Sequence, residues 1–178
     1  WADGGRRTVI RSRGTGLEAH ADLVVKVPAG KRVELHLAAG RIEATNVNGD
    51  LDIDVYSASV RATGTKGRLF IDAGSGSVRV ADASGDLEID TGSGSTTLEG
   101  LRMSSVKVDA GSGSVDARDV EAARFSVDVG SGSVRAERLS TDDLLVDTGS
   151  GGVRLDLAKV PRRSGIDTGS GGVTLALW

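Results

Sequence analysis

Residues 108–115 read Val-Asp-Ala-Gly-Ser-Gly-Ser-Val, and this stretch recurs along the chain. Five further segments share its pattern, in which an aliphatic residue and Asp precede a small or branched residue, Gly-Ser-Gly, a Ser or Gly, and usually Val. The Asp residues of these six copies follow one another at steps of 18, 19, 19, 19 and 20 residues: Asp72, Asp90, Asp109, Asp128, Asp147 and Asp167. Two upstream segments, residues 35–42 and 53–60, keep the apolar positions but lack the paired glycines. The chain therefore contains eight copies of one repeat.

Apolar and polar residues alternate on both sides of the Gly-Ser-Gly segment. The copy around Asp109 has its apolar residues at Val106, Val108, Ala110, Val115 and Ala117. Such alternation is typical of a strand with one buried face, and the glycines permit a tight turn between two strands. Each copy therefore predicts a strand, a turn, a second strand and a connector. The connector varies in length, from residues 82–86 to residues 157–165, and we expect a loop there.

Two architectures fit this pattern, a meander of hairpins and a stacked solenoid in which each repeat forms one coil. The near-identity of the copies favours the solenoid, because equivalent positions of successive coils then lie above one another, about 4.8 Å apart, under the same packing demands. We predict an all-β, single-domain parallel β-solenoid (β-helix) of about eight 18–20-residue coils, right-handed as parallel crossovers usually are. Equivalent residues that should then stack are Val78, Thr96, Val115, Val134 and Val153.

The beginning of the chain differs from the repeats. Residues 1–30 are predicted to form an N-terminal cap region, and residues 31–178 the regular coils. Within the cap region, residues 23–27 are strand-like and residues 28–30 predict a turn. Ile10 and residues 17–19 are interpreted as a ninth, degenerate coil.

Composition excludes several classes of function. The 178 residues carry a net charge of -3, which gives no long-range field to attract nucleic acid. The absence of cysteine excludes disulfides, thiolate catalysis and iron–sulfur clusters, and the two histidines, His20 and His36, are too few for a His-rich metal site. No apolar run approaches the roughly 20 residues of a membrane-spanning helix. The first residue is Trp1, so we expect that the chain is a mature or trimmed fragment.

The Asp residues of the repeat predict a column of carboxylates. Residues 90–93, 147–150 and 167–170 each read Asp-Thr-Gly-Ser, the aspartic-protease tetrapeptide, but that chemistry needs two carboxylates facing each other across two lobes. We expect a structural role, with each Asp accepting hydrogen bonds from the amides of the following turn. Calcium is the alternative, because one carboxylate per coil together with Ser and carbonyl oxygens could supply oxygen ligands.

Two further columns follow from the period. The turn serines, of which Ser93 and Ser112 are examples, are expected to bond between coils and not to act as nucleophiles, since no His follows them in the sequence. On the second strand, Arg61, Arg79, Arg135 and Arg154 occupy one outward position, interrupted by Thr97, Asp116 and Thr174. This column is interpreted as a solvated strand face, with a basic stripe for anionic glycans or lipids as the alternative.

Several segments resemble a known family. The runs Val-Lys-Val-Pro-Ala-Gly at residues 25–30, Asn-Gly-Asp-Leu at 48–51 and Ser-Gly-Asp-Leu at 84–87, followed by repeated Asp-x-Gly-Ser-Gly-Ser-Val, are similar to bacterial β-strand-repeat domains of unknown function that are classed as adhesins. The similarity covers roughly residues 23 to 178. It implies a parallel β-solenoid on the outer side of a bacterial membrane, without enzymatic activity; some relatives act in responses to envelope stress.

We therefore expect a non-catalytic structural or interaction module of a bacterial envelope or secreted protein, located outside the cytoplasm. No catalytic, cofactor-binding or metal-binding residues are assigned, and no cofactor is expected. The expected partner is a surface polymer or a protein, not nucleic acid, and end-to-end self-association would follow from uncapped coils. A sensory domain in an envelope-stress response and a carbohydrate-active β-helix enzyme are the alternatives.

Overall fold

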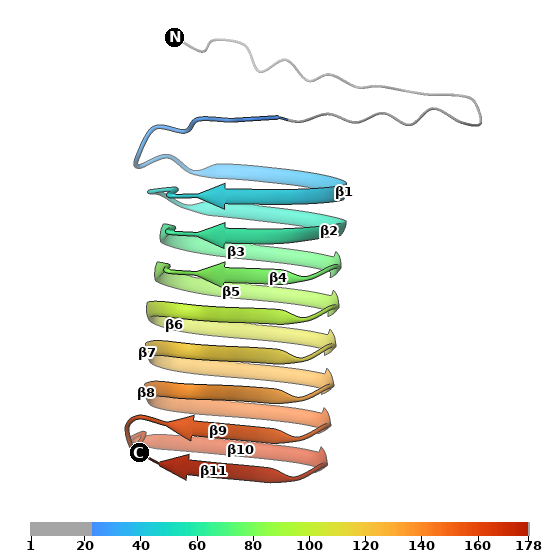
Figure 1. The fold of residues 1–178 in the computed structure, drawn as a ribbon, viewed down its shortest axis with the longest axis vertical. Helices are drawn as coiled ribbons and strands as arrows, with labels where there is room; N and C mark the ends of the chain where they lie inside the picture. The colour runs from blue at the N-terminus through green and yellow to red at the C-terminus, as the bar shows by residue number, and fades with distance from the viewer. Residues whose placement is uncertain (1–22, 178) are drawn as a thin grey trace, which may run out of the picture.

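A computed structural model describes residues 23–177, which form a single parallel β-solenoid of about eight turns without a helix (Figure 1). Every pairing between strands is parallel, and the coils follow one another along the axis of the rod. The predicted fold class is therefore confirmed. The strands are β1 (Val33–Thr45), β2 (Leu51–Thr63), β3 (Lys66–Ser75), β4 (Val78–Ala81), β5 (Ser84–Ser93), β6 (Thr96–Ser112), β7 (Val115–Ser131), β8 (Val134–Ser150), β9 (Val153–Leu157), β10 (Arg163–Ser170) and β11 (Val173–Leu177).

The predicted stacking of equivalent residues is confirmed. Val78 pairs with Thr96, Thr96 with Val115, Val115 with Val134, and Val134 with Val153. Each coil has two long walls, seen as the front and back strand layers of Figure 1. We call them the Asp wall, which carries the column Asp54, Asp72, Asp90, Asp109, Asp128, Asp147 and Asp167, and the Arg wall, which carries Arg61, Arg79, Arg135 and Arg154.

The Gly-Ser-Gly turns join the two walls at one corner. Their amides donate to carbonyl groups of the next coil: Gly113 N to Ser131 O at 3.0 Å, and Val115 N to Ser133 O at 3.0 Å. At the second glycine the chain passes so close to the preceding coil that a side chain cannot fit. A Cβ on Gly113, whose φ is +142°, would stand 2.0 Å from the Gly94 carbonyl oxygen. Glycine at this position is thus a packing requirement as well as a conformational one.

The connector corner differs from the prediction. β6, β7 and β8 run through it without a break, so the connectors of these coils are bent strand and not loop. One residue per coil makes the bend with a positive φ: Asn46, Gly64, Asp82, Gly100, Asp119 and Arg138. Asn, Asp and Gly adopt this region most readily. The strands are interrupted at the connectors of residues 46–50, 64–65, 82–83 and 158–162, and the last of these is tied back by the amide of Arg162, which donates to Asp142 O at 2.8 Å.

The extra residue of the 19-residue repeat is also placed here. Between β5 and β6 the register shifts, since Gly85 pairs with Met103 but Asp86 pairs with Ser105. Ser104 is therefore inserted as a bulge that later coils keep, because Met103 and Ser105 pair with Ala122 and Arg124 without a further shift.

The core is a single column of small aliphatic side chains between the walls. Phe125 is the one fully buried aromatic residue among residues 23–177. Thr91, Thr96, Thr141 and Thr148 are the buried polar residues of the wall positions, together with Thr65 at the connector corner. Two of their hydroxyl groups, those of Thr91 and Thr96, have no hydrogen-bond partner among the described residues. The side chains of the central coils are accordingly buried almost completely, as in a close-packed protein interior.

The two ends of the solenoid are less buried. The predicted strand at residues 23–27 is wrong, because these residues have no ladder partner and Leu23 and Val24 are exposed; they lie across the end of the rod beyond β1 (Figure 1). The predicted turn is present at residues 29–30. At the other end, Val173, Leu175 and Leu177 point inward in register with Val153, Leu155 and Leu157, yet all three are about half exposed. The proposed degenerate coil at Ile10 and residues 17–19 lies outside the described residues.

Candidate functional site

The carboxylates of the Asp wall form an unbroken column. Asp54 pairs with Asp72, and the column continues in register through Asp167, with each side chain exposed. At its upper end His36 Nδ1 lies 3.3 Å from Asp54 Oδ2. Parallel in-register pairing therefore places like charges on adjacent strands, an arrangement that costs stability.

The cost is visible at Asp72. Burial, with repulsion from Asp90 and Asp54 added, raises the pKa of the Asp72 carboxyl above its ordinary value. Lower on the Asp wall, in the column beside these carboxylates, the Lys107 ammonium offsets part of the repulsion between Asp90 and Asp109. Lys107 donates to Glu88 Oε1 at 3.0 Å, and this hydrogen bond, with attraction to Asp109 and Asp90 as a smaller cause, raises the pKa of the Lys107 ammonium.

The expected caps by the column carboxylates are wrong. The second turn glycine and the residue that opens the second strand donate their amides to carbonyls of the next coil, and no turn amide in residues 23–177 bonds a column Asp. The three Asp-Thr-Gly-Ser tetrapeptides lie one above another, and Asp147 pairs with Asp167 in the same column instead of facing it across a cleft. Among the described residues, no three His, Asp or Glu side chains gather in a way that could hold a metal ion.

The turn serines stack as predicted, and two of them bond between coils. Ser112 Oγ donates to Ser93 Oγ at 3.3 Å, and Ser75 Oγ donates to the Tyr56 carbonyl at 3.4 Å. Of the two histidines, His36 lies beside Asp54 on the first coil, while His20 is outside the described residues. The described serines of the turns thus serve the stacking of coils.

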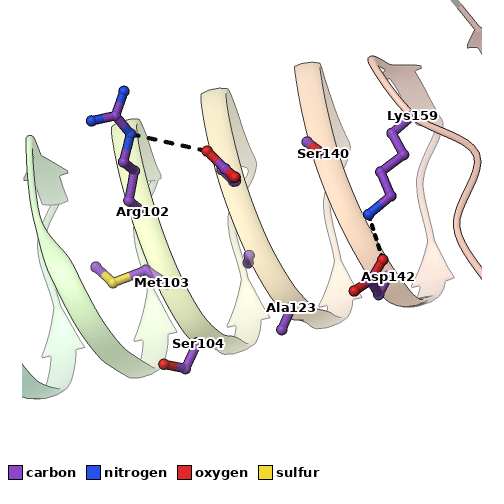
Figure 2. Close-up of a pocket in the computed structure, with 9 residues that line it drawn as sticks. Arg102, Met103, Ser104, Ala123, Ser140, Asp142 and Lys159 are labelled. Atoms are coloured by element: carbon purple, nitrogen blue, oxygen red, sulfur yellow. Dashed lines mark hydrogen bonds and ion pairs between the residues drawn. The ribbon is translucent and has the colours of Figure 1, made fainter.

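A hollow of about 410 Å³ opens at the connector corner across β6, β7 and β8 (Figure 2). Its charged residues face one another from successive coils: Arg102 Nε lies 4.0 Å from Glu121 Oε2, and Lys159 Nζ bonds Asp142 Oδ1. The hydrogen bond from Lys159 lowers the pKa of the Asp142 carboxyl. Lys159 thereby favours the ionised form of Asp142 over the protonated form that a general acid needs.

A second cluster of paired charges borders this hollow. Arg138 Nε and Nη2 bond the two oxygens of Asp119 at 2.5 and 2.6 Å, although the residues are 19 positions apart. This fork lowers the pKa of the Asp119 carboxyl and raises that of the Arg138 guanidinium. The connector corner is therefore charged but largely self-compensated.

The arginines of the Arg wall divide into two groups. Arg135 donates twice to Glu137 Oε1, at 2.9 and 2.7 Å, and Arg118 lies 3.4 Å from the other oxygen of Glu137. Arg61 and Arg79 pair directly in the ladder, and within residues 23–177 neither guanidinium has a carboxylate within 4.0 Å. Arg154, the fourth arginine of the column, likewise has no carboxylate within 4.0 Å among the described residues, so Arg135 is the member of the column whose charge is paired.

The unpaired arginines border a shallow hollow of about 260 Å³. Its lining residues are Arg41, Ser59, Val60, Arg61, Ser77 and Arg79. Sequence reasoning missed Arg41, because it belongs to a degenerate first copy. The signal was present in the alignment of the repeats, where Arg41 occupies the position of Ser59 and Ser77.

Comparison with known proteins identifies one family. A family model described as Toastrack DUF4097 matches residues 20–178. No curated protein and no solved structure matches the chain.

Proposed function

Because the chain belongs to the Toastrack DUF4097 family of β-repeat domains of unknown function, we propose that it is a non-catalytic interaction module of a bacterial envelope or secreted protein. Its role is to hold rows of side chains at fixed intervals of about 4.8 Å. A surface polymer or a protein that repeats along its own length would meet several equivalent positions at once, so that weak contacts add up to useful affinity.

The register of the coils is the observation that carries this proposal. Between β6, β7 and β8 the pairing continues without a shift over both walls and the connector corner. Side chains on such a ladder keep their spacing, because moving one coil would break the hydrogen bonds and core contacts of its neighbours. The molecule is thus built as a rigid scaffold with a regular surface.

The charge pairing at the connector corner supports the absence of catalysis. Glycoside hydrolysis needs one carboxyl with a raised pKa as the acid. In the hollow that Asp142 lines, Lys159 lowers the pKa of that carboxyl instead. This surface therefore supports a carbohydrate-active enzyme less well than it supports an interaction module.

The envelope location rests on the family resemblance of the sequence. Residues 23–177 include no helix of the length and apolarity that a bilayer crossing requires. Fractionation of cells carrying the native gene, with protease added to intact cells, tests the location. Recovery of the protein in the cytosolic fraction alone would contradict it.

Binding is tested by co-sedimentation. The purified chain is mixed with washed bacterial envelopes, and we expect saturable co-sedimentation that unlabelled chain displaces and heat-unfolded chain does not reproduce. In the same mixtures, release of reducing sugar ends is measured. Release that depends on folded protein and disappears in an Asp142→Asn variant would mean that the module is an enzyme.

End-to-end association of two copies is proposed as a second property. The inward side chains of β11, Val173, Leu175 and Leu177, are about half exposed, and those of β1, Val33 and Leu35, are partly buried. Joining rods through the β11 end would bury this apolar surface and would pair the outer edge of β11 with another strand, whereas at the other end residues 23–27 lie across β1.

A further inference from the structure

Arg61 and Arg79 are stacked like charges, and within residues 23–177 neither guanidinium has a carboxylate within 4.0 Å. They are direct partners in the ladder between β2 and β4, so their backbones lie about 4.8 Å apart. In the same column, Glu43 on β1 pairs with Arg61, and Thr97 on β6 pairs with Arg79. The Glu43 carboxylate lies beside Arg41, at 3.9 Å, and does not line the hollow. On this part of the Arg wall, three guanidinium groups thus stand beside one carboxylate, that of Glu43.

The same wall shows the compensated arrangement elsewhere. Arg135 occupies the same column, and there Glu137, two residues further along the strand, accepts two hydrogen bonds from it. The residues that correspond to Glu137 in the first coils are Thr45, Thr63 and Ala81, none of which carries a charge. Arg61 and Arg79 are therefore two uncompensated arginines on adjacent coils, whereas Arg154, which also has no carboxylate within 4.0 Å among the described residues, pairs with the compensated Arg135.

The hollow between these arginines is lined by donors. Arg41, Arg61 and Arg79 line it, each carrying a guanidinium group, and Ser59 and Ser77 of the neighbouring column line it too, each carrying a hydroxyl. Guanidinium groups match the oxygens of phosphate with two parallel hydrogen bonds, and a tetrahedral phosphate accepts from several directions at once. A volume of about 260 Å³ accommodates such a group with the atoms that flank it.

We propose that this hollow binds a phosphate group of a hydrophilic phosphodiester polymer. The inference rests on the proposed interaction function and names the chemistry of its partner. A membrane surface fits less well, because interfacial binding needs apolar area beside the basic groups. None of the exposed large hydrophobic residues within residues 23–177 lines the hollow, and its single aliphatic residue, Val60, is buried.

The test measures binding of soluble poly(glycerol phosphate) by calorimetry at low and moderate salt. The variant Arg61→Thr with Arg79→Thr removes both charges, and Thr is compatible with the column because Thr97 pairs with Arg79 there. The control is Arg135→Thr, at the same column position but beside Glu137. We expect the double variant to bind about tenfold or more weakly and with a shallower salt dependence, and the control to bind like the wild type. Thermal melting verifies that both variants fold.

Three results would overturn the proposal: no binding of the polymer by the wild type at low salt, equal losses in the double variant and the control, or binding of phosphatidylglycerol vesicles without binding of the polymer. Inorganic phosphate, added as a competitor, should displace the polymer. Failure of the phosphate site can be distinguished from failure of the proposed interaction function. If the double variant still co-sediments with envelopes as the wild type does, the interaction function stands and the phosphate site fails.

Discussion

Gly113 lies directly against Gly94 of the preceding coil, so close that a Cβ on Gly113 would stand 2.0 Å from the Gly94 carbonyl oxygen. The second glycine of the next turn is equally confined, since a Cβ on Gly132 would stand 2.1 Å from the Gly113 carbonyl oxygen. The turn corner therefore leaves no room for a side chain at this position, and its second glycines should be among the least replaceable residues of the repeat.

Gly113→Ala should lower the free energy of unfolding by roughly 3 kcal/mol or more, because backbone must move and Ala is strained at this φ. Gly172→Ala is the matched control, since a Cβ there meets no atom within 4 Å. It should change stability by about 0.5 kcal/mol or less. Urea denaturation measures both, and similar losses in the two variants would contradict the close-approach argument.

Leu155 and Leu175 occupy equivalent positions of adjacent coils but differ in burial, at 0% and 56% exposed. Leu155→Ala should lower the free energy of unfolding by about 2 to 5 kcal/mol, as buried Leu-to-Ala substitutions do. Leu175→Ala should cost clearly less, because over half of its surface is already in water. Denaturation of the two variants at low protein concentration distinguishes these outcomes. Equal costs would mean that the last coil is covered in solution.

The exposed end also predicts a concentration effect. Sedimentation velocity should reveal association of the wild-type chain as its concentration rises. Leu177→Glu should abolish this association while leaving the melting temperature at low concentration nearly unchanged, because a charge at an apolar contact must be desolvated. A wild type that remains monomeric at all concentrations would rule out end-to-end association.

Asp72 predicts a gain in stability by removal of a charge. Its pKa is raised in the folded chain, so the ionised form is less favourable there than in the unfolded chain. The resulting cost is present above the folded pKa and disappears as the pH falls through that value toward 3.8, the ordinary value of Asp. Asp72→Asn should therefore raise the melting temperature at neutral pH, and the gain should vanish in acid. Asp167→Asn, with one column neighbour among the described residues, should gain less.

The pKa of the Asp119 carboxyl is shifted in the opposite direction from that of Asp72, so Asp119 affects stability in the opposite way. Its pKa is lowered chiefly by the hydrogen bond from Arg138, so the pair stabilises the fold at pH values above the ordinary value of 3.8. That contribution is lost as the pH falls below 3.8 through the lower folded pKa. Asp119→Asn should melt below the wild type at neutral pH, and the two curves should converge in acid once the pH lies below the lowered folded pKa of Asp119. A difference that persists in acid would indicate a backbone role for Asp119 at its positive φ.

Much of the fold was predictable because parallel in-register stacking repeats one set of packing demands in every coil. Val115 and Val134 pair as their spacing predicted. The connector could not be predicted in the same way. Gly100, Asp119 and Arg138 differ chemically, so the bend that they share leaves no common sequence signal. The bulge at Ser104 is also invisible in the pattern, although the repeat length changes there from 18 to 19 residues.

Of the candidate site, the sequence predicted only that its arginines lie in one column. Spacing placed Arg61, Arg79 and Arg135 on one line, but it could not tell that Glu137 compensates Arg135 while Arg61 and Arg79 lack such a partner. Nor did it bring in Arg41, which reaches the hollow from a different column.

The amino-acid sequence alone determined that the chain winds into stacked coils, because its period and alternation specify which positions face the core and which glycines allow close approach. The tertiary structure decided which charges meet. Arg138 bonds Asp119 one coil away, whereas Arg61 has another arginine, Arg79, as its partner in the next coil. The reason is physical: stacking depends on the average chemistry of a repeat, while an ion pair depends on the side-chain conformations and the neighbours of two particular residues.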